Sequence, residues 1–468
     1  MNKSFWLLAA LLFITNASCG DGGNEGECDL AEPDCAEGLV CEAVQGGNPH
    51  CFAPLVVRGV VLDAVDEAPI RGALVQAVDA SGIASGSSDE TGEDGRFALT
   101  VPAIRDAEGT PLEGSYMLRA QAAGYQPFPT AIRPALPLAA PSAQEIDGEW
   151  VIETAITTVL LLPLPGDTSD LGSISGRVLA ARPGGILIVA QGQGSGHIGF
   201  SDAGGDYTIF NVPAGSYGVH GYAGEVQLDP ADVSLAAGED KTGVDLAEAS
   251  RPVSTVAGNV QIVNAPGGSK TSVVLAVEST FVEDAALGQV PPGLRAGEVN
   301  GEFIIEGVPD GRYVVLAAFE NDGLVRDPDQ TIGGTRIVHI EVPDPQTANT
   351  VTLPEGFKVT EALAVIRPGA DGPEAVSTQT PVFEWADDSS EDGYEIHVFD
   401  AFGEEIWSDE IGDVSGTETV EHRYGGPTLE EGMYYQFHAI SFRERTGERT
   451  AISATEDLLG VFTYQNNP

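Results

Sequence analysis

Five cysteines are the residues of this chain whose spacing most clearly predicts chemistry. Four of them, Cys28, Cys35, Cys41 and Cys51, lie in one short segment, and no cysteine follows. In exported proteins, an even and clustered set of cysteines is typical of two disulfide bonds, which stabilise segments that have few large apolar residues. A structural zinc site is the alternative, but the spacings contain no Cys-x-x-Cys pair. We therefore expect a disulfide-bonded module over residues 28–53.

Acidic turns are the second set of residues that could do chemistry, as calcium ligands. The segments DETGEDG (residues 89–95) and DDSSEDG (residues 387–393) gather carboxylates in turns, and calcium prefers such oxygen ligands. Neither segment has EF-hand spacing, and solvated acidic loops are common in a chain of this charge. We favour solvated loops and expect no cofactor, with calcium as the alternative. The candidate calcium ligands are Asp89, Glu93, Asp94, Asp387, Asp388 and Asp392.

The motifs of common enzyme classes do not occur in the sequence. None of the seven histidines has a glutamate three residues later, and there is no His-Glu-x-x-His, Gly-x-Ser-x-Gly or Gly-Lys-Ser/Thr motif. The glycine-rich segment 192–199 lies between two expected strands, which indicates a hairpin loop instead of a nucleotide cradle. His397, His422 and His438 would approach one another if their strands pair as expected, but we interpret them as ordinary imidazoles. We expect no catalytic residues and no enzyme.

Residues 1–18 have the features of an export signal. Lys3 precedes an apolar run over residues 5–14, and this run is shorter than the roughly 20 residues that span a bilayer. The small residues Ala17 and Ser18 then precede Cys19 and Gly20. This order resembles the bacterial lipoprotein processing site, although Asn16 stands where that family favours leucine. The resemblance implies a lipid on Cys19, a tether over residues 19–27 and sorting to the outer membrane, and an ordinary secretory signal is the alternative.

The charge of the chain is strongly negative. Lys+Arg number 22 against 71 Asp+Glu, a formal net charge of −49, while 42% of the residues are hydrophobic. Such a surface repels nucleic acid, so we expect no nucleic-acid partner. The hydrophobic share favours globular domains over disorder, and 468 residues are enough for three or four of them.

Short apolar runs separated by turn residues predict an all-β chain of tandem antiparallel β-sandwiches. The segment SDAGGDYTIFNVPAGSYGVHGY (residues 201–222) has the same order of turn, strand, Val-Pro turn and strand as GEVNGEFIIEGVPDGRYVVLAA (residues 297–318). A looser copy begins at residue 91. In the third copy, alternation places Phe303 and Ile305 on one face of the strand. The repeat is therefore expected to be a folding hairpin and not a reaction centre.

These repeats resemble the carboxypeptidase regulatory-like domain, a transthyretin-like β-sandwich. Gly-x-Val near each start, then Asp/Asn-Gly-x-Phe/Tyr and Pro-x-Gly-x-Tyr, carry the resemblance, with the glycines at Gly59, Gly176 and Gly258. It implies three sandwiches, over residues 54–165, 171–249 and 253–353, that act as accessory modules. The segment PDCAEGLVC resembles small cysteine-rich modules that follow the anchor of bacterial surface proteins. Among the three possible pairings, that resemblance implies Cys28 with Cys41 and Cys35 with Cys51.

Residues 357–468 resemble a fibronectin type III or immunoglobulin-like domain. Trp385 would be its core tryptophan and Tyr435 its corner tyrosine. We therefore expect a non-enzymatic surface lipoprotein, anchored in the membrane at Cys19, whose sandwiches form a rod for structural or adhesive roles. Its partner would be an envelope protein or a surface polysaccharide. The alternative is a carbohydrate-binding protein, which would need exposed aromatics, and only 4 tryptophans exist.

Overall fold

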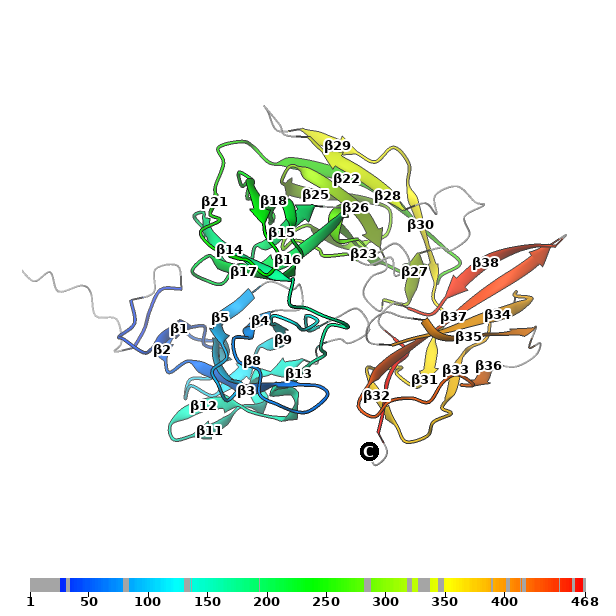
Figure 1. Cartoon of the computed structure of the whole chain (residues 1–468), viewed down its shortest axis with the longest axis horizontal. Helices are drawn as coiled ribbons and strands as arrows, with labels where there is room; N and C mark the ends of the chain where they lie inside the picture. Colours follow the sequence, from blue (N-terminus) through cyan, green and yellow to red (C-terminus); the bar gives the residue numbers. More distant parts are fainter. Residues whose placement is uncertain are drawn as a thin grey trace, which may run out of the picture.

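The structure, a computed structural model, describes residues 26–465 except 31–33, 79–83, 130–134, 136, 193, 282–287, 318–321, 327–336, 344–348, 389, 401–404, 413, 415–417, 446 and 457–458. The expected export signal and Cys19 lie outside the described residues. Nearly all regular structure of these described residues is β-strand, together with three short 3-10 turns (Figure 1). Within the described part of the chain, no helix is long and apolar enough to cross a membrane.

The N-terminal module is a two-stranded hairpin held by two disulfide bonds. Strand β1 (Val40–Glu42) pairs with β2 (His50–Phe52). The disulfides join Cys28 to Cys41 and Cys35 to Cys51, which is the pairing that the resemblance implied. Because the hairpin is so short, these crosslinks replace a hydrophobic core.

The first sandwich follows directly. One sheet has the strand order β10-β9-β4-β5, and the other has β11-β12-β3-β13 with β6 on the free side of β3. Between the sheets lies a core that includes Leu55, Val57, Phe97 and Leu118. Its elements are β3 (Leu55–Asp63), β4 (Leu74–Val78), β5 (Ala84–Glu90), β6 (Arg96–Val101), β7 (Ile104–Arg105), β8 (Pro111–Glu113), β9 (Ser115–Gln121), β10 (Leu138–Ala139), η1 (Ala140–Ser142), β11 (Gln144–Ile146), β12 (Glu149–Ile152), η2 (Ala155–Thr157) and β13 (Thr158–Leu161).

The second sandwich repeats this plan with sheets β17-β14-β20, with β21 also on β14, and β16-β15-β18-β19. Its core includes Ile174, Ile188, Tyr207 and Val219. Its strands are β14 (Gly172–Leu179), β15 (Leu187–Gly192), β16 (Ser195–Phe200), β17 (Asp206–Val212), β18 (Gly215–Tyr222), β19 (Ala231–Leu235), β20 (Asp240–Lys241) and β21 (Leu246–Ala247).

The third sandwich has sheets β25-β22-β30-β27, with β29 also on β22, and β24-β23-β26-β28. Phe303 and Ile305 are buried in its core while Ile304 is 61% exposed, which confirms the register read from the alternation. Its elements are β22 (Ser254–Val263), β23 (Thr271–Val277), η3 (Glu278–Thr280), β24 (Arg295–Val299), β25 (Glu302–Val308), β26 (Gly311–Ala317), β27 (Leu324–Arg326), β28 (Val338–Val342), β29 (Thr350–Thr352) and β30 (Phe357–Glu361).

The boundary expected after residue 353 is wrong. Strand β30, expected to open the fourth domain, pairs in parallel with β22 and places Phe357 and Val359 in the third core. The first strand of each of these three sandwiches likewise pairs in parallel with a strand from the end of its own sandwich. One sheet of each of these sandwiches is therefore mixed, while the other sheet is antiparallel throughout.

Two of the three motif glycines, Gly59 and Gly176, have a shared reason in this pairing. A Cβ on Gly59 would lie 2.0 Å from the carbonyl oxygen of Thr157, and one on Gly176 would lie 1.9 Å from that of Val244. Such distances are impossible, so only glycine lets the closing segment approach the first strand.

The fourth sandwich has sheets β31-β33-β36 and β32-β39-β37-β34-β35, with β38 also on β37. Trp385 is fully buried beside Tyr394, and Tyr435 is buried with its hydroxyl accepting the N–H of Glu430, so both predicted core aromatics are core residues. The strands are β31 (Val365–Arg367), β32 (Glu374–Val376), β33 (Val382–Ala386), β34 (Gly393–Asp400), β35 (Glu405–Gly412), β36 (Thr419–Arg423), β37 (Tyr434–Arg445), β38 (Glu448–Ala454) and β39 (Val461–Tyr464).

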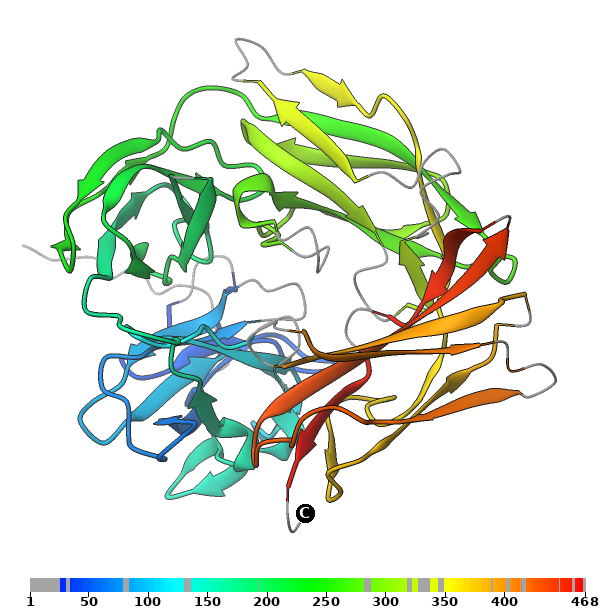
Figure 2. The same cartoon turned by 45° about the vertical axis from the view of Figure 1, so that its right-hand side comes forward.

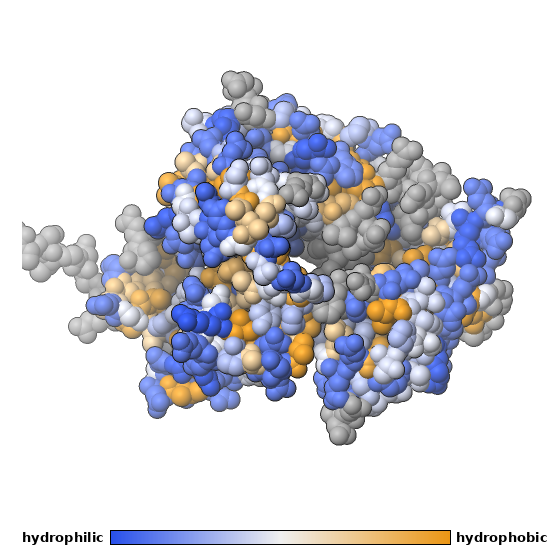
Figure 3. Space-filling view, viewed as in Figure 1, coloured by the Kyte–Doolittle hydropathy of each residue, from blue (hydrophilic) through white to orange (hydrophobic). Residues whose placement is uncertain are grey.

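The four sandwiches do not form the expected rod. They follow one another around a closed path, and the fourth returns to lie beside the first (Figures 1 and 2). The closing contact is an apolar cluster of Ala64 and Leu162 from the first sandwich with Met433 and Tyr434 from the fourth. An opening is visible near the middle of the mostly hydrophilic face in Figure 3. In a rod, consecutive domains follow one another in a line. Here, hydrogen bonds from side chains hold each pair of consecutive domains against each other and bend the chain at the junction.

Candidate functional site: the joints between the modules

The three Val-Pro turns found in the sequence each contain the same kind of internal hydrogen bond. In each, the tyrosine that leads the next strand donates its hydroxyl proton to the carbonyl of the turn proline. Burial raises the pKa of these tyrosines, so the hydroxyl remains a donor at physiological pH. The turn is thus locked from inside, and its outer side meets another module. The pairs are Tyr116 with Pro102, Tyr217 with Pro213 at 2.8 Å and Tyr313 with Pro309 at 3.0 Å.

The first Val-Pro turn docks on the cysteine module through a buried carboxylate. Glu42 follows Cys41 in β1, and its side chain accepts the backbone N–H of Ala103 at 2.8 Å. It also pairs with Arg105, with 2.5 Å between Nε and Oε2. Glu42 is 3% exposed and Arg105 is fully buried. Burial raises the pKa of Glu42, and the Arg105 guanidinium opposes this shift.

The buried guanidinium of Arg105 has further partners on both sides of this joint. It donates to the carbonyl of Gly109 at 2.9 Å and to that of Ala53, in the connection out of the module, at 3.0 Å. A buried pair of this kind is a weak source of net stability but is costly to break from one side. The cysteine module therefore has a fixed orientation on the first sandwich and is not attached to it by a free linker.

The second Val-Pro turn docks on the first sandwich through Asn211, the residue before Val212. Its side-chain Oδ1 accepts the N–H of Gly124 at 2.6 Å, and its Nδ2 donates to the carbonyls of Ala122 at 3.1 Å and Tyr125 at 2.9 Å. Asn211 has a φ of 60°, a left-handed conformation that asparagine tolerates better than most residues. One amide side chain thus satisfies three backbone groups of the neighbouring domain.

A buried cation reinforces this joint. The guanidinium of Arg119 lies over the ring of Phe200 in the second sandwich, 3.4 Å from its centroid. Burial lowers the pKa of Arg119, which nevertheless stays charged at neutral pH. Beside it, Gln76 donates to the carbonyl of Ser201 at 3.3 Å. A desolvated cation over an aromatic face is favourable in this geometry and specifies how the two domains meet.

The third Val-Pro turn docks on the second sandwich in the same manner. Gly307 takes the place of Asn211 with a φ of 72°, and its carbonyl accepts the N–H of Glu225 at 2.8 Å. The N–H of Asp310 donates to Gln227 at 2.9 Å. Tyr222 packs edge-on against Tyr313, with 5.9 Å between ring centroids.

One scheme therefore recurs along the chain. Each Val-Pro turn is received by the module that precedes it: by Glu42 in the cysteine module, and then by the loop after the Tyr-led strand. We call the loops at residues 122–126 and 223–227 the receiving loops. Gly124 and Glu225 donate to the incoming Val-Pro turns from these loops, while Gly224 donates to the carbonyl of Pro292, outside the turn, at 2.7 Å.

The third and fourth sandwiches meet at a different kind of joint. The buried carboxylate of Glu456 accepts the N–H of Gly323 at 2.8 Å, and burial raises its pKa. Ser453 donates its hydroxyl proton to the carbonyl of Glu361 at 2.6 Å, and the N–H of Leu363 donates to that of Ala454 at 2.8 Å. Backbone and side-chain bonds thus fix the fourth sandwich on the end of the third.

The sequence interpretation missed these joints, although a signal was present. Leu187 and Val189 of β15 pack into the third core, while Ile188 and Ala190 face the second. Strand β23 is likewise buried at every position. Both are continuous apolar runs without alternation, the pattern of strands covered on both faces.

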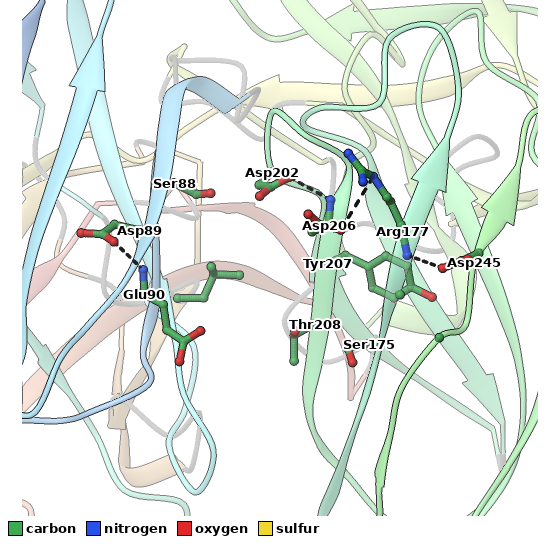
Figure 4. A pocket seen from close by; sticks show the side chains of 13 residues that line it. Ser88, Asp89, Glu90, Ser175, Arg177, Asp202, Asp206, Tyr207, Thr208 and Asp245 are labelled. Atoms are coloured by element: carbon green, nitrogen blue, oxygen red, sulfur yellow. Dashed lines mark hydrogen bonds and ion pairs between the residues drawn. The ribbon is translucent and has the colours of Figure 1, made fainter. Parts of the chain in front are cut away.

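A polar cleft of about 520 Å³ lies between the first and second sandwiches (Figure 4). Asp89 and Glu90 line one side, and Arg177 with several aspartates lines the other. Many of these groups have partners within the chain, since Arg177 donates to Gly204 at 2.9 Å and Asp202 accepts the N–H of Asp206 at 2.8 Å. The cleft is therefore an open polar surface, and its charged side chains stabilise nearby turns by hydrogen bonds to the backbone.

The first predicted calcium loop is folded by its own backbone bonds. Asp89 accepts the N–H groups of Glu90 and Ala98, both at 2.9 Å. Glu93 lies 3.6 Å from Arg71, and Asp94 accepts the N–H of Arg96 at 3.3 Å. The structure does not bring Asp89, Glu93 and Asp94 together as a ligand set.

The carboxylates of the second predicted calcium loop, residues 387–393, also accept hydrogen bonds from within the protein. Asp387 accepts the hydroxyl of Tyr394 at 2.9 Å, Asp388 accepts those of Ser390 and Ser441 at 2.9 Å, and Asp392 accepts the N–H of Glu444 at 2.7 Å. Among the described residues, the only three side chains close enough to share a metal ion are Cys28, Cys35 and Cys41. All three are in disulfides, which excludes them as zinc ligands.

Two of the three histidines considered in the sequence are neighbours. His397 lies opposite His438 across β34 and β37. Burial, and secondarily His397, lowers the pKa of His438 to about 4, so it is neutral at physiological pH. His422 lies in the other sheet, 2.9 Å from Asp409 and stacked on Trp407. The expected approach holds for one pair only.

Tryptophans are the residues that a carbohydrate reader would expose. Trp385 is fully buried, Trp407 packs between Phe383 and His422, and Trp150 packs against the first core. The described tryptophans are therefore used in packing.

Comparison with known proteins adds only distant likenesses. No protein-family model and no curated protein matches the sequence. Among solved structures, the chain is similar to the Bacillus anthracis TIE protein, at 12% identity over 85% of this chain and 68% of that one, with a TM-score of 0.16. It is similar to a streptococcal ancillary pilin at 14% identity, covering 66% and 98% of the two chains, with a TM-score of 0.16. A DUF3823 family protein from Bacteroides ovatus is 10% identical over 45% and 99%, with a TM-score of 0.21. These scores are too low to support an argument about function.

Proposed function

We propose that this chain is a non-enzymatic surface protein, exported and anchored by a lipid on Cys19, that presents a pre-assembled body of β-sandwiches to a protein of the cell envelope. The observation that carries this proposal is the use of its buried and half-buried polar groups. Glu42, Arg105, Asn211 and Glu456 are all engaged in holding one module against the next. Polar side chains that are engaged with structural partners suit presentation of a surface and not turnover.

The protein partner is favoured over a polysaccharide by the aromatic residues. Sugar binding by a sandwich relies on exposed aromatic rings, and Trp385, Trp407 and Trp150 pack within their domains. The acidic surface instead suits a partner with basic residues, because complementary charge speeds association.

Membrane fractionation tests the anchor. Replacing Cys19 by alanine should move the protein from the membrane pellet to the soluble fraction, whereas Ser18→Ala keeps a small residue before the cysteine and should stay in the pellet. A Cys19→Ala protein that remains in the pellet after a high-salt wash would refute lipid anchoring.

Capture from native envelope tests the partner. Crosslinking followed by a pull-down should recover an envelope protein with the wild-type chain, and recovery should fall at high salt if charge drives the encounter. Saturable binding on a glycan array, with no protein crosslinked, would favour the carbohydrate alternative instead.

A further inference from the structure

The contact that closes the ring differs in kind from the other joints. Leu162 is 8% exposed and packs with Ala64 against Met433 and Tyr434 of the fourth sandwich. The sequential joints contain buried charges or side-chain bonds to backbone groups. The closing contact is a small apolar cluster, and so small a contact would be weak if it stood alone.

We propose that this contact is a reversible latch, through which closure of the fourth sandwich onto the first stabilises the joint between the first and second sandwiches. The cluster forms within one chain, so the fixed joints supply a high effective concentration and a small contact is enough to hold the ring closed. Lifting the fourth sandwich would leave the joint of the cysteine module and the two joints among the first three sandwiches intact, and it would open the ring into an arc. This inference does not depend on the lipid anchor or on the partner.

The coupling follows from where Leu162 lies. Its carbonyl accepts the N–H of Gln126 at 2.8 Å, and the N–H of Leu164 donates to the carbonyl of Gly124 at 2.8 Å. Tyr125 forms a bridge with Pro163 in the same ladder. The residue that contacts the fourth sandwich is thus hydrogen-bonded directly to the first receiving loop.

That receiving loop is the one that binds Asn211. Gly124 uses its carbonyl for Leu164 and its N–H for Asn211, so a single peptide segment connects the latch to the domain joint. Ala64, the other latch residue of the first sandwich, donates its N–H to the carbonyl of Leu161 at 2.9 Å. Tyr125 also donates its hydroxyl proton to Asp63, beside Ala64, at 2.9 Å. Closure therefore restrains the loop, and coupling between the two contacts must be reciprocal.

Hydrogen–deuterium exchange on the purified full chain tests both directions of the coupling. Met433→Asp places a charge in the latch, and Leu162→Ala weakens it from the opposite side. Both variants should exchange several-fold faster in peptides that cover residues 122–128 and 208–214. Val65→Asp is the matched control, because Val65 is next to Ala64 but 77% exposed, and it should change nothing.

The reciprocal variant completes the test. Asn211→Ala should speed exchange in the peptide that contains Met433, although Asn211 does not belong to the latch cluster. If Leu162→Ala and Met433→Asp leave residues 122–128 as protected as in the wild type, the coupling is refuted. If Met433→Asp speeds exchange throughout the fourth sandwich, that variant has unfolded the domain and Leu162→Ala decides: unchanged protection at residues 208–214 overturns the latch, and faster exchange there supports it.

Discussion

The side-chain amide of Asn211 in the second sandwich accepts the backbone N–H of Gly124 in the first at 2.6 Å, and thereby joins a repeated turn of one domain to a repeated loop of another. The same turn in the third sandwich uses a backbone carbonyl at Gly307 instead. The Val-Pro hairpin therefore has two roles. Its inner tyrosine locks the turn, and its outer edge sets the angle between domains.

Replacing Asn211 should loosen the first of these joints. Asn211→Gly keeps the left-handed backbone but removes three hydrogen bonds, and we expect a loss of about 1–3 kcal/mol in the free energy of unfolding. Asn211→Ala should cost roughly 1 kcal/mol more because alanine disfavours positive φ. Calorimetry of both variants, with Asn264→Gly as a control of similar φ outside the joint, checks this. Equal stability of Asn211→Gly and wild type would contradict the role assigned to the side chain.

Breaking the Glu42–Arg105 pair from one side should be more damaging. Glu42→Ala leaves a fully buried guanidinium without its carboxylate, and the expected loss is about 3–5 kcal/mol. Arg58→Ala is a suitable control because the Arg58–Glu149 pair is solvent-exposed and should contribute less than about 1 kcal/mol. Denaturant unfolding of the first sandwich measures both. Similar effects of the two substitutions would mean that the cysteine module docks loosely.

Phe303 tests the repeat register energetically. Its ring is 4% exposed in the third core, so Phe303→Ala should cost about 3–5 kcal/mol. Ile304→Ala, one residue along and largely exposed, should change the free energy of unfolding by less than about 0.5 kcal/mol. If calorimetry showed a larger loss for Ile304→Ala than for Phe303→Ala, the opposite face of the strand would pack into the core.

Acid should destabilise the fourth sandwich through His438. Its folded pKa is about 4 against a usual value of 6.5, so between these values the unfolded chain binds more protons than the folded one. Stability should therefore fall as pH falls from about 6.5 to about 4. Fluorescence of the buried Trp385 reports this unfolding. His438→Gln should flatten the pH dependence in that window while His422→Gln retains it, and an unchanged slope in His438→Gln would rule out this residue as the cause.

Some of this structure was predictable because local chemistry determines it. Alternation placed Phe303 and Ile305 in the core, turn residues marked the hairpins, and the crowded cysteines indicated two disulfides. The pairing of β30 with β22 was not, because a parallel partner leaves no turn between the strands to mark it. Nor was the ring, since Leu162 and Met433 carry no pattern that relates them.

The joints between the domains could be predicted from the sequence only in part. Unbroken apolar runs in β15 and β23 indicate burial on both faces, yet they do not say which neighbour covers them. Asn211 is an ordinary turn residue in sequence, and only its contact with Gly124 reveals its second role.

The most direct test of the account is the radius of gyration of the chain that follows Cys19, residues 20–468, measured by small-angle X-ray scattering. A closed body of this length should have a radius close to the roughly 22 Å that compact-chain scaling gives, slightly enlarged by the central opening. Four such domains placed end to end would give roughly 40 Å by the same scaling. A value near the lower figure supports interlocked sandwiches closed into a ring, and a value near the higher one would contradict it.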